Sequence, residues 1–172
     1  MILIEPPIQA KFGRLLRRRA LAAFVLEAAQ AAKLRGDVSV LLTGDAHIRR
    51  LNREFRHKDQ PTDVLSFPAN PHKPKEGLYG VAGAVPRIAG DLAISVETAA
   101  RQGKRAGHSL ATELQILVLH GLLHLAGYDH ETDSGKMARK EAALRRRFGL
   151  AHGLIERAVQ TGVPMKKRGR TP

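Results

Sequence analysis

The chain has 172 residues, enough for one domain with a sizeable core, and 43% of them are hydrophobic. It has no cysteine, which excludes disulfides and thiolate metal sites, and no apolar run long enough to cross a bilayer. The 29 Lys and Arg residues against 16 Asp and Glu give a formal net charge of +13, which favours nucleic acid or a ribonucleoprotein as partner. Because the first residues lack the basic and apolar regions of a secretory signal, we expect a cytoplasmic protein without a membrane partner.

The first part of the chain is predicted to alternate strands with helices. Residues 1–4 form a short apolar strand that ends at two prolines, and residues 37–43 form a strand rich in β-branched side chains. Between them, apolar residues recur with a period near 3.6 over residues 11–33, which predicts one long helix. Asp45 is expected to cap a further helix that runs to about residue 53.

Two prolines, Pro61 and Pro68, bracket a strand predicted at residues 62–67. They place it at an edge of the sheet, because proline cannot donate to a strand ladder. Arg56 is expected in the loop that precedes this strand. The next predicted elements are a long loop rich in Pro and Gly at 69–89, a strand at 90–96 and a basic amphipathic helix at 97–105.

The last third of the chain is predicted to be mainly helical. Ser109 caps an apolar helix, and Asp133 or Ser134 begins another that ends near residue 148. The basic segment 164–172 lacks apolar periodicity, so we expect a disordered tail beside a single domain of residues 1–163. The order of the elements predicts an α+β domain, in which a small mixed β-sheet packs with several helices and the central helix bears histidines.

The stretch HGLLHLAGYDH, residues 120–130, contains three of the eight histidines. His120 and His124 are one helical turn apart, so their side chains lie on one face of the helix and can reach a single ion. Gly127 can take the left-handed conformation that ends a helix and turns the chain back, which brings His130 toward the same ion. Three imidazole ligands with an open fourth position are typical of catalytic zinc.

A histidine on an apolar helix is more often a satisfied core residue than a metal ligand. Here the surrounding helix is apolar almost all round, and two unpaired imidazoles would be costly to bury in it. A metal ion removes that cost, so the spacing predicts a metal site. Nickel, copper and cobalt also bind three imidazoles, so the spacing does not choose among these metals.

Peptidases with an H-E-x-x-H motif use the glutamate after the first histidine as general base, and Gly121 occupies that position here. This disfavours peptide hydrolysis and leaves water activation to the metal or to another side chain. Cleavage of a phosphodiester needs its developing negative charge neutralised, a task suited to arginine. Arg56 is the candidate, and the simpler alternative is one surface arginine among many.

The HGLLHLAGYDH block, together with QPTDVLSFP and GDLAIS upstream, closely resembles the YbeY family of bacterial rRNA maturation endoribonucleases over about residues 37–148. The resemblance implies a fold similar to that of metal hydrolases, with one zinc ion per chain held by His120, His124 and His130. It implies that Arg56 acts on the RNA phosphate. It also implies cleavage of single-stranded RNA in maturation of the 16S rRNA 3′ end and in ribosome quality control, with the small ribosomal subunit and ribosomal proteins as partners.

Two features depart from the family's usual pattern. The loop at 69–89 is longer and more basic than the family's usual connection, and the tail at 164–172 lies outside the matched block. Asp129, next to the last histidine, has two interpretations of equal weight. It orients an imidazole as an outer partner of the metal site, or it caps the following turn.

Three functions are compatible with these observations. The first is a metal-dependent endoribonuclease, in which either water or the 2′-hydroxyl of the RNA attacks the phosphate. The second is a ribosome-assembly factor that binds rRNA or a ribosomal protein and uses its metal to hold the fold together. The third is a metallopeptidase, against which Gly121 and the positive charge both count.

Overall fold

The computed structural model describes residues 1–69, 88–130 and 132–150. Its elements in chain order are β1 (Ile2–Ile4), α1 (Pro6–Phe12), α2 (Arg18–Ala31), β2 (Asp37–Thr43), α3 (Asp45–Arg56), β3 (Val64–Pro68), β4 (Ile88–Ser95), α4 (Val96–Ala106), α5 (Leu110–Leu125) and α6 (Lys136–Phe148). The predicted segments at 69–89 and 164–172 lie wholly or largely outside the described residues. No helix in the described part of the chain has the length and apolar character needed to cross a bilayer.

The described strands form one mixed sheet in the order β1-β2-β4-β3. β1, β2 and β4 are parallel, and β3 pairs with β4 in the antiparallel sense, with Ser66 opposite Leu92. This confirms the predicted α+β class with a small mixed sheet. β3 lies at an edge, as its flanking prolines predicted.

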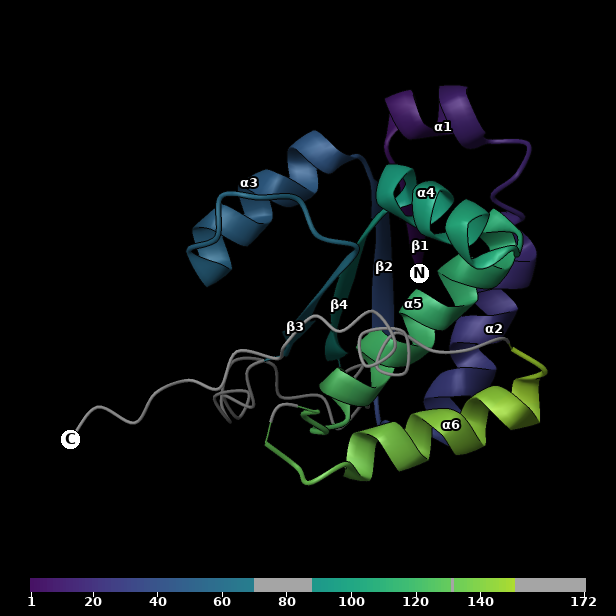
Figure 1. Ribbon diagram of the computed structural model, residues 1–172, viewed down its shortest axis with the longest axis vertical. Coiled ribbons are helices and arrows are strands. Elements are labelled where there is room, and N and C mark those ends of the chain that lie inside the picture. The colour runs from purple at the N-terminus through teal and green to yellow at the C-terminus, as the bar shows by residue number, and fades with distance from the viewer. Residues whose placement is uncertain (70–87, 131, 151–172) are drawn as a thin grey trace, which may run out of the picture.

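Helices cover both faces of the sheet (Figure 1). On one face, Leu92 and Ile94 of β4 belong to the main core, to which α2, α5 and α6 contribute. On the other face, Ala93 and Leu65 pack against Ile48 of α3 in a smaller cluster. Because successive residues of a strand point to opposite faces, α5 and α3 lie on opposite sides of the sheet.

The central helix, α5, is buried along most of its 16 residues. Ser109 begins it as predicted, since its hydroxyl oxygen accepts a hydrogen bond of 3.1 Å from the Thr112 amide. Glu113 is fully buried in the first turn and lies 2.5 Å from Nε2 of His108. After the helix, Gly127 has a φ of 87°, the left-handed conformation expected at this turn.

Two helix predictions are wrong in detail. The single helix expected at 11–33 is divided into α1 and α2, because the chain leaves the helical path and Arg17 takes a left-handed conformation with a φ of 40°. The two prolines that follow β1 occupy the first turn of α1. Amide groups in the first turn of a helix have no acceptor within the helix, so the absence of an amide hydrogen in proline breaks no helical hydrogen bond there. Arg56, expected in a loop, is the last residue of α3.

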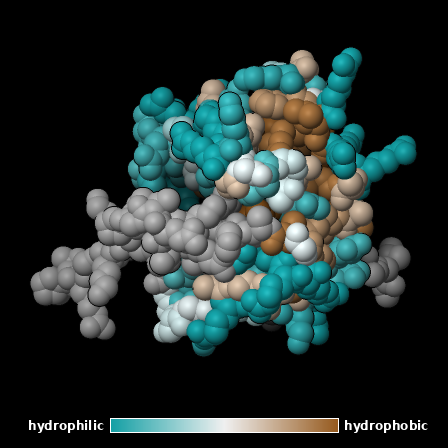
Figure 2. Space-filling view, turned by 45° about the vertical axis from the view of Figure 1, so that its right-hand side comes forward, coloured by the Kyte–Doolittle hydropathy of each residue, from teal (hydrophilic) through white to brown (hydrophobic). Residues whose placement is uncertain are grey.

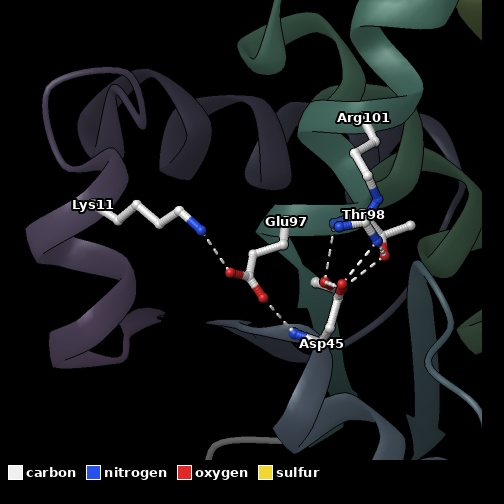
Figure 3. Close-up of polar contacts among 6 residues, drawn as sticks. Lys11, Asp45, Glu97, Thr98 and Arg101 are labelled. Carbon is white, nitrogen blue, oxygen red and sulfur yellow. Dashed lines mark hydrogen bonds and ion pairs between the residues drawn. The ribbon is translucent and has the colours of Figure 1, made fainter.

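Asp45 has a different role from the predicted cap. Gly44 is the capping residue, and the Asp45 carboxylate accepts hydrogen bonds of 2.5, 2.7 and 2.7 Å from Ser95, Thr98 and Arg101 (Figure 3). The Asp45 amide donates to Glu97 at 3.0 Å. These bonds tie the start of α3 to the start of α4 at the carboxyl ends of β2 and β4.

A second polar link joins this junction to α1. Lys11 donates to the other oxygen of Glu97 at 2.8 Å, so this one carboxylate accepts from both the lysine and the backbone amide of Asp45 (Figure 3).

On the face that Figure 2 displays, hydrophilic side chains surround an apolar area. The large apolar side chains exposed in the described residues are Met1, Leu3, Leu15, Leu26, Phe55 and Ile88.

Loss of the Asp45 charge is predicted to destabilise the protein. Burial alone would raise the pKa of the Asp45 carboxyl, but hydrogen bonds from Ser95, Thr98 and Arg101 hold it below its ordinary value. A carboxyl with a lowered pKa stabilises the fold above its unfolded-state pKa of about 3.9, and this stability is lost as pH falls through the folded-state pKa. We expect Asp45→Asn to lower the free energy of unfolding at pH 7 by about 1–2 kcal/mol.

Urea denaturation at several pH values measures this effect. The difference between wild type and Asp45→Asn is expected to shrink as the pH falls below about 4, where wild type loses the same charge. Asp37→Asn, at the exposed start of β2, is the matched control and should have little effect. A pH-independent deficit in Asp45→Asn would contradict the role of the charge.

Candidate metal centre

The structure brings together the three histidines singled out by their spacing, hereafter the histidine triad: His120, His124 and His130. His120 and His124 lie on successive turns of α5, and His130 follows the turn at Gly127. One nitrogen from each ring lies within 4.8 Å of the others. The Nε2 atoms of His120 and His124 are 3.1 Å apart. Their role as metal ligands stays a prediction, and the geometry it requires is present.

The electrostatics of the triad favour an uncharged ring at His124. Burial first, and then the neighbouring imidazoles of His120 and His130, lower the pKa of His124 to about 4. The Asp129 carboxylate and a backbone hydrogen bond with Tyr128 act in the opposite direction but do not prevail. The neutral imidazole is the form that binds a metal, so His124 is ready to coordinate one at neutral pH. These donors fit a borderline-soft ion such as zinc.

Glu141 is a site residue that the sequence analysis did not identify. It is only 2% exposed on α6, and its Oε2 lies 3.4 Å from Nδ1 of His120. Its second oxygen, Oε1, is buried without a hydrogen-bond partner among the described residues. A carboxylate behind a histidine holds the ring in one tautomer and orientation and increases its basicity as a ligand. Glu141 is therefore placed to orient His120.

A signal for Glu141 is present in the sequence. Met137, Glu141 and Leu144 are four and three residues apart, so they share the face of α6 that packs into the core. An acidic residue within an apolar stripe is rarely left without a partner, because burial of an isolated carboxylate is expensive. The identity of that partner required the tertiary structure, since His120 is 21 residues away along the chain.

Gly121 explains why no peptidase-like glutamate follows His120. A Cβ atom at this position would lie 2.7 Å from Cδ2 of Leu92 and 3.2 Å from the hydroxyl of Ser66. Leu92 is 1% exposed and cannot move aside easily. The helix face at Gly121 is thus in close contact with β4 and β3, which leaves no room for a glutamate side chain at this position.

Asp129 makes the contacts expected of a residue that caps the following turn. Its carboxylate accepts a hydrogen bond of 3.0 Å from the Thr132 hydroxyl, and its carbonyl accepts from the amides of Thr132 and Asp133. These contacts belong to the turn that leads to α6. The same carboxylate is close enough to His124 to raise the pKa of that ring. Its role as an outer partner of a metal stays a prediction.

Arg56 comes from a different face of the sheet than the histidine triad. It is exposed at the end of α3, and α5 lies across the sheet from it. Within residues 1–69, 88–130 and 132–150, its guanidinium makes no hydrogen bond or ion pair, whereas its neighbours Arg49 and Arg53 both pair with Asp59. The guanidinium is therefore available to an external anion, and its action on a phosphate stays a prediction.

The chain is similar to known proteins over most of its length. The sequence model of the YbeY family, described as Endoribonuclease YbeY, matches residues 9–149. The Endoribonuclease YbeY of Koribacter versatilis (strain Ellin345) is 45% identical over 150 residues, 87% of this chain and 90% of that protein. The Endoribonuclease YbeY of Moorella thermoacetica is 48% identical over 126 residues, 70% of this chain and 80% of that protein. The solution structure of TM1509 from Thermotoga maritima has a TM-score of 0.52 and 27% identity, and covers 97% of this chain and 100% of that one.

The histidine triad predicts one bound transition-metal ion per chain. We expect added Zn²⁺ to raise the midpoint of thermal unfolding, because a ligand that binds only the folded state stabilises it. Loss of an outer partner of a metal ligand lowers metal affinity by roughly 10- to 100-fold. We expect His124→Ala, which removes a ligand itself, to lower zinc affinity by more than this. Chelator competition measures the affinity, and His47→Ala, outside the triad, is the control. An unchanged affinity in His124→Ala would refute the site.

Replacement of Glu141 tests its contact with His120 separately. We expect Glu141→Gln to lower zinc affinity by roughly 10- to 100-fold, since the neutral amide supports the imidazole less strongly. The matched control is Glu54→Gln on the exposed side of α3, which should bind zinc as wild type does. Circular dichroism establishes that both variants are folded. Wild-type affinity in folded Glu141→Gln would show that this carboxylate does not support the metal ligand.

Proposed function

The chain belongs to the YbeY family of endoribonucleases, and from this membership we propose that it is a zinc-dependent enzyme that cleaves single-stranded RNA. Its proposed role is rRNA maturation, including the 3′ end of 16S rRNA, and ribosome quality control in the cytoplasm. The small ribosomal subunit and ribosomal proteins are its proposed partners. Residues 1–163 are proposed as the catalytic domain, with 164–172 as a basic tail.

The convergence of the histidine triad is the observation that carries this proposal. Three imidazoles leave one position of a tetrahedral ion for water or substrate, whereas structural zinc is usually closed by four protein ligands. Zinc held there supplies a Lewis acid and a reactive water near neutral pH. A formal net charge of +13 suits a polyanionic substrate such as RNA.

The side chains of this chain have distinct proposed roles in the reaction. His120, His124 and His130 hold the ion, and Glu141 keeps the ring of His120 in one orientation through its Nδ1. Arg56 is proposed to donate hydrogen bonds to the phosphate and to stabilise the negative charge that develops there. Attack by water and attack by the RNA 2′-hydroxyl place the same demand on Arg56.

The alternative class is an assembly factor with a structural metal, and one experiment separates the two. Wild type, Arg56→Ala and the matched control Arg50→Ala, also exposed on α3, are compared for zinc content and cleavage of single-stranded RNA. We expect all three to hold about one zinc. Cleavage by Arg56→Ala should fall by about 10²- to 10³-fold, as on removal of a donor that stabilises a transition-state charge.

The outcomes assign the function. Cleavage by wild type and Arg50→Ala but not by zinc-loaded Arg56→Ala supports the enzyme. If all three hold zinc and none cleaves RNA above background, the endoribonuclease proposal fails and the assembly factor takes its place. If Arg56→Ala cleaves as wild type does, the chain is an endoribonuclease in which Arg56 has no catalytic role.

A further inference from the structure

Phe55 is an aromatic side chain that the fold leaves largely exposed. It continues the inward stripe of α3, in which Ile48, Leu51 and Asn52 pack toward the sheet. Ile48 is fully buried, but Phe55, two turns later, is 56% exposed. The stripe passes beyond the edge of the sheet, because β3 is the last strand on this side. The ring therefore exposes apolar surface to water, and burial of that surface against a binding partner would be favourable.

The contact that Phe55 does make is with another aromatic ring. Its ring centroid lies 5.1 Å from that of Phe67 on β3, with an interplanar angle of 75°. This edge-to-face arrangement is a favoured geometry of aromatic pairs. Phe67 is only partly buried and packs against the small cluster under α3. The pair thus offers an aromatic surface at the edge of the described sheet.

Basic side chains outnumber acidic ones beside this surface, although the exposed Asp91 lies opposite Phe67 on β4 and the exposed Glu54 precedes Phe55. Two acidic side chains lie between α3 and β3. Asp63 accepts from the Val64 amide and from Gln102, and Asp59 accepts from Arg49 at 2.9 and 2.8 Å and lies 3.7 Å from Arg53. Arg56, His57 and Lys58 are exposed, and none has an acidic partner among the described residues. The turn begins at His57, whose φ of 54° is in the left-handed region. The buried Asn52 stabilises the turn by donating a hydrogen bond of 2.8 Å to the Gln60 carbonyl.

The aromatic surface is also connected to the histidine triad by a short structural path. Ser66, which precedes Phe67 on β3, lies 3.4 Å from the carbonyl of Gly121, the residue after His120. The end of β3 also lies close to the end of α5. A Cβ atom at Gly90 of β4 would clash with the Phe67 carbonyl oxygen and would be 2.8 Å from Cδ2 of Leu125. β3 is the edge strand of the described sheet, so the α3 face and the α5 face meet along it.

From these observations we propose that Phe55 and Phe67 form a stacking platform for an unpaired nucleobase of single-stranded RNA, with Arg56, His57 and Lys58 beside the adjoining phosphates. This inference rests on the proposed ribonuclease function and adds a binding subsite to it. A base presents a flat face to an aromatic ring whatever its sequence, so the platform is sequence-tolerant. Bases in a duplex are stacked on each other and cannot reach it, which makes the platform selective for single strands.

The test measures binding apart from cleavage. Fluorescence anisotropy gives the affinity of the zinc-loaded full chain for a single-stranded 2′-O-methyl oligonucleotide and for the same backbone with abasic positions. The variants are Phe55→Ala, Phe55→Leu, which keeps apolar contact with Phe67 but lacks a ring, and Phe55→Trp. Leu26→Ala is the matched control, because Leu26 is exposed at 65% on α2. Cleavage of the unmodified RNA is recorded alongside for every protein.

Stacking predicts a specific pattern of affinities. Phe55→Ala and Phe55→Leu should bind the base-bearing strand about 5- to 150-fold more weakly than wild type. Both should bind the abasic strand as wild type does. Phe55→Trp and Leu26→Ala should bind both strands like wild type. The salt dependence of binding should be unchanged in Phe55→Ala, because phosphate contacts determine it.

Two results would overturn the platform. One is wild-type affinity of Phe55→Ala and Phe55→Leu for the base-bearing strand. The other is an equal loss on both strands, which would mean that Phe55 supports the fold or the phosphate contacts instead. Cleavage of RNA by wild type together with either result leaves the ribonuclease standing without this subsite. Base-dependent binding without any cleavage would instead support the platform and reject the enzyme.

Discussion

The rest of the structure depends on the burial of α5 on nearly every side. A helix that is apolar all round must be enclosed, and the sheet, α2, α4 and α6 surround this one. Its polar side chains must then find partners inside the protein. Glu113 meets His108 near the first turn, and His120 meets Glu141 and His124 near the last. Enclosure of α5 therefore lowers the pKa of His124 and supplies the carboxylate behind His120.

Close packing of α5 on the sheet has a chemical consequence. Gly121 lets the helix approach Leu92 and Ser66, and that approach leaves no space for a carboxylate next to His120. A metal site built on this helix thus lacks the general base of the common metallopeptidases. The same approach brings the edge strand β3 beside the triad. The site therefore lacks an internal base and lies beside an edge strand of the described sheet.

The distribution of acidic side chains decides where the positive charge of the protein is available. Asp45 and Glu97 hold α1, α3 and α4 together, and Asp59 is engaged by Arg49 and Arg53. At the end of α3 basic side chains outnumber acidic ones, and Arg56, His57 and Lys58 have no acidic partner among the described residues, although Glu54 beside them is also exposed. An anionic polymer is attracted to such a surface at long range and at a salt-dependent rate.

The sequence by itself determined the features that depend on short-range geometry. The spacing of His120, His124 and His130 with Gly127 predicted their convergence, because a helical turn and a left-handed glycine act over a few residues. The bounds of β2, the edge position of β3 and the cap at Ser109 were predicted for the same reason. Local patterns were sufficient there.

The tertiary structure alone decided contacts between residues far apart in the chain. Helical periodicity over 11–33 did not reveal the break at Arg17, because both helices present apolar faces to one core. Glu141 became a partner of His120 only when α6 packed on α5, and Phe55 remained exposed only because β3 ends the sheet. Such contacts depend on how whole elements pack, which no pattern of neighbouring residues specifies.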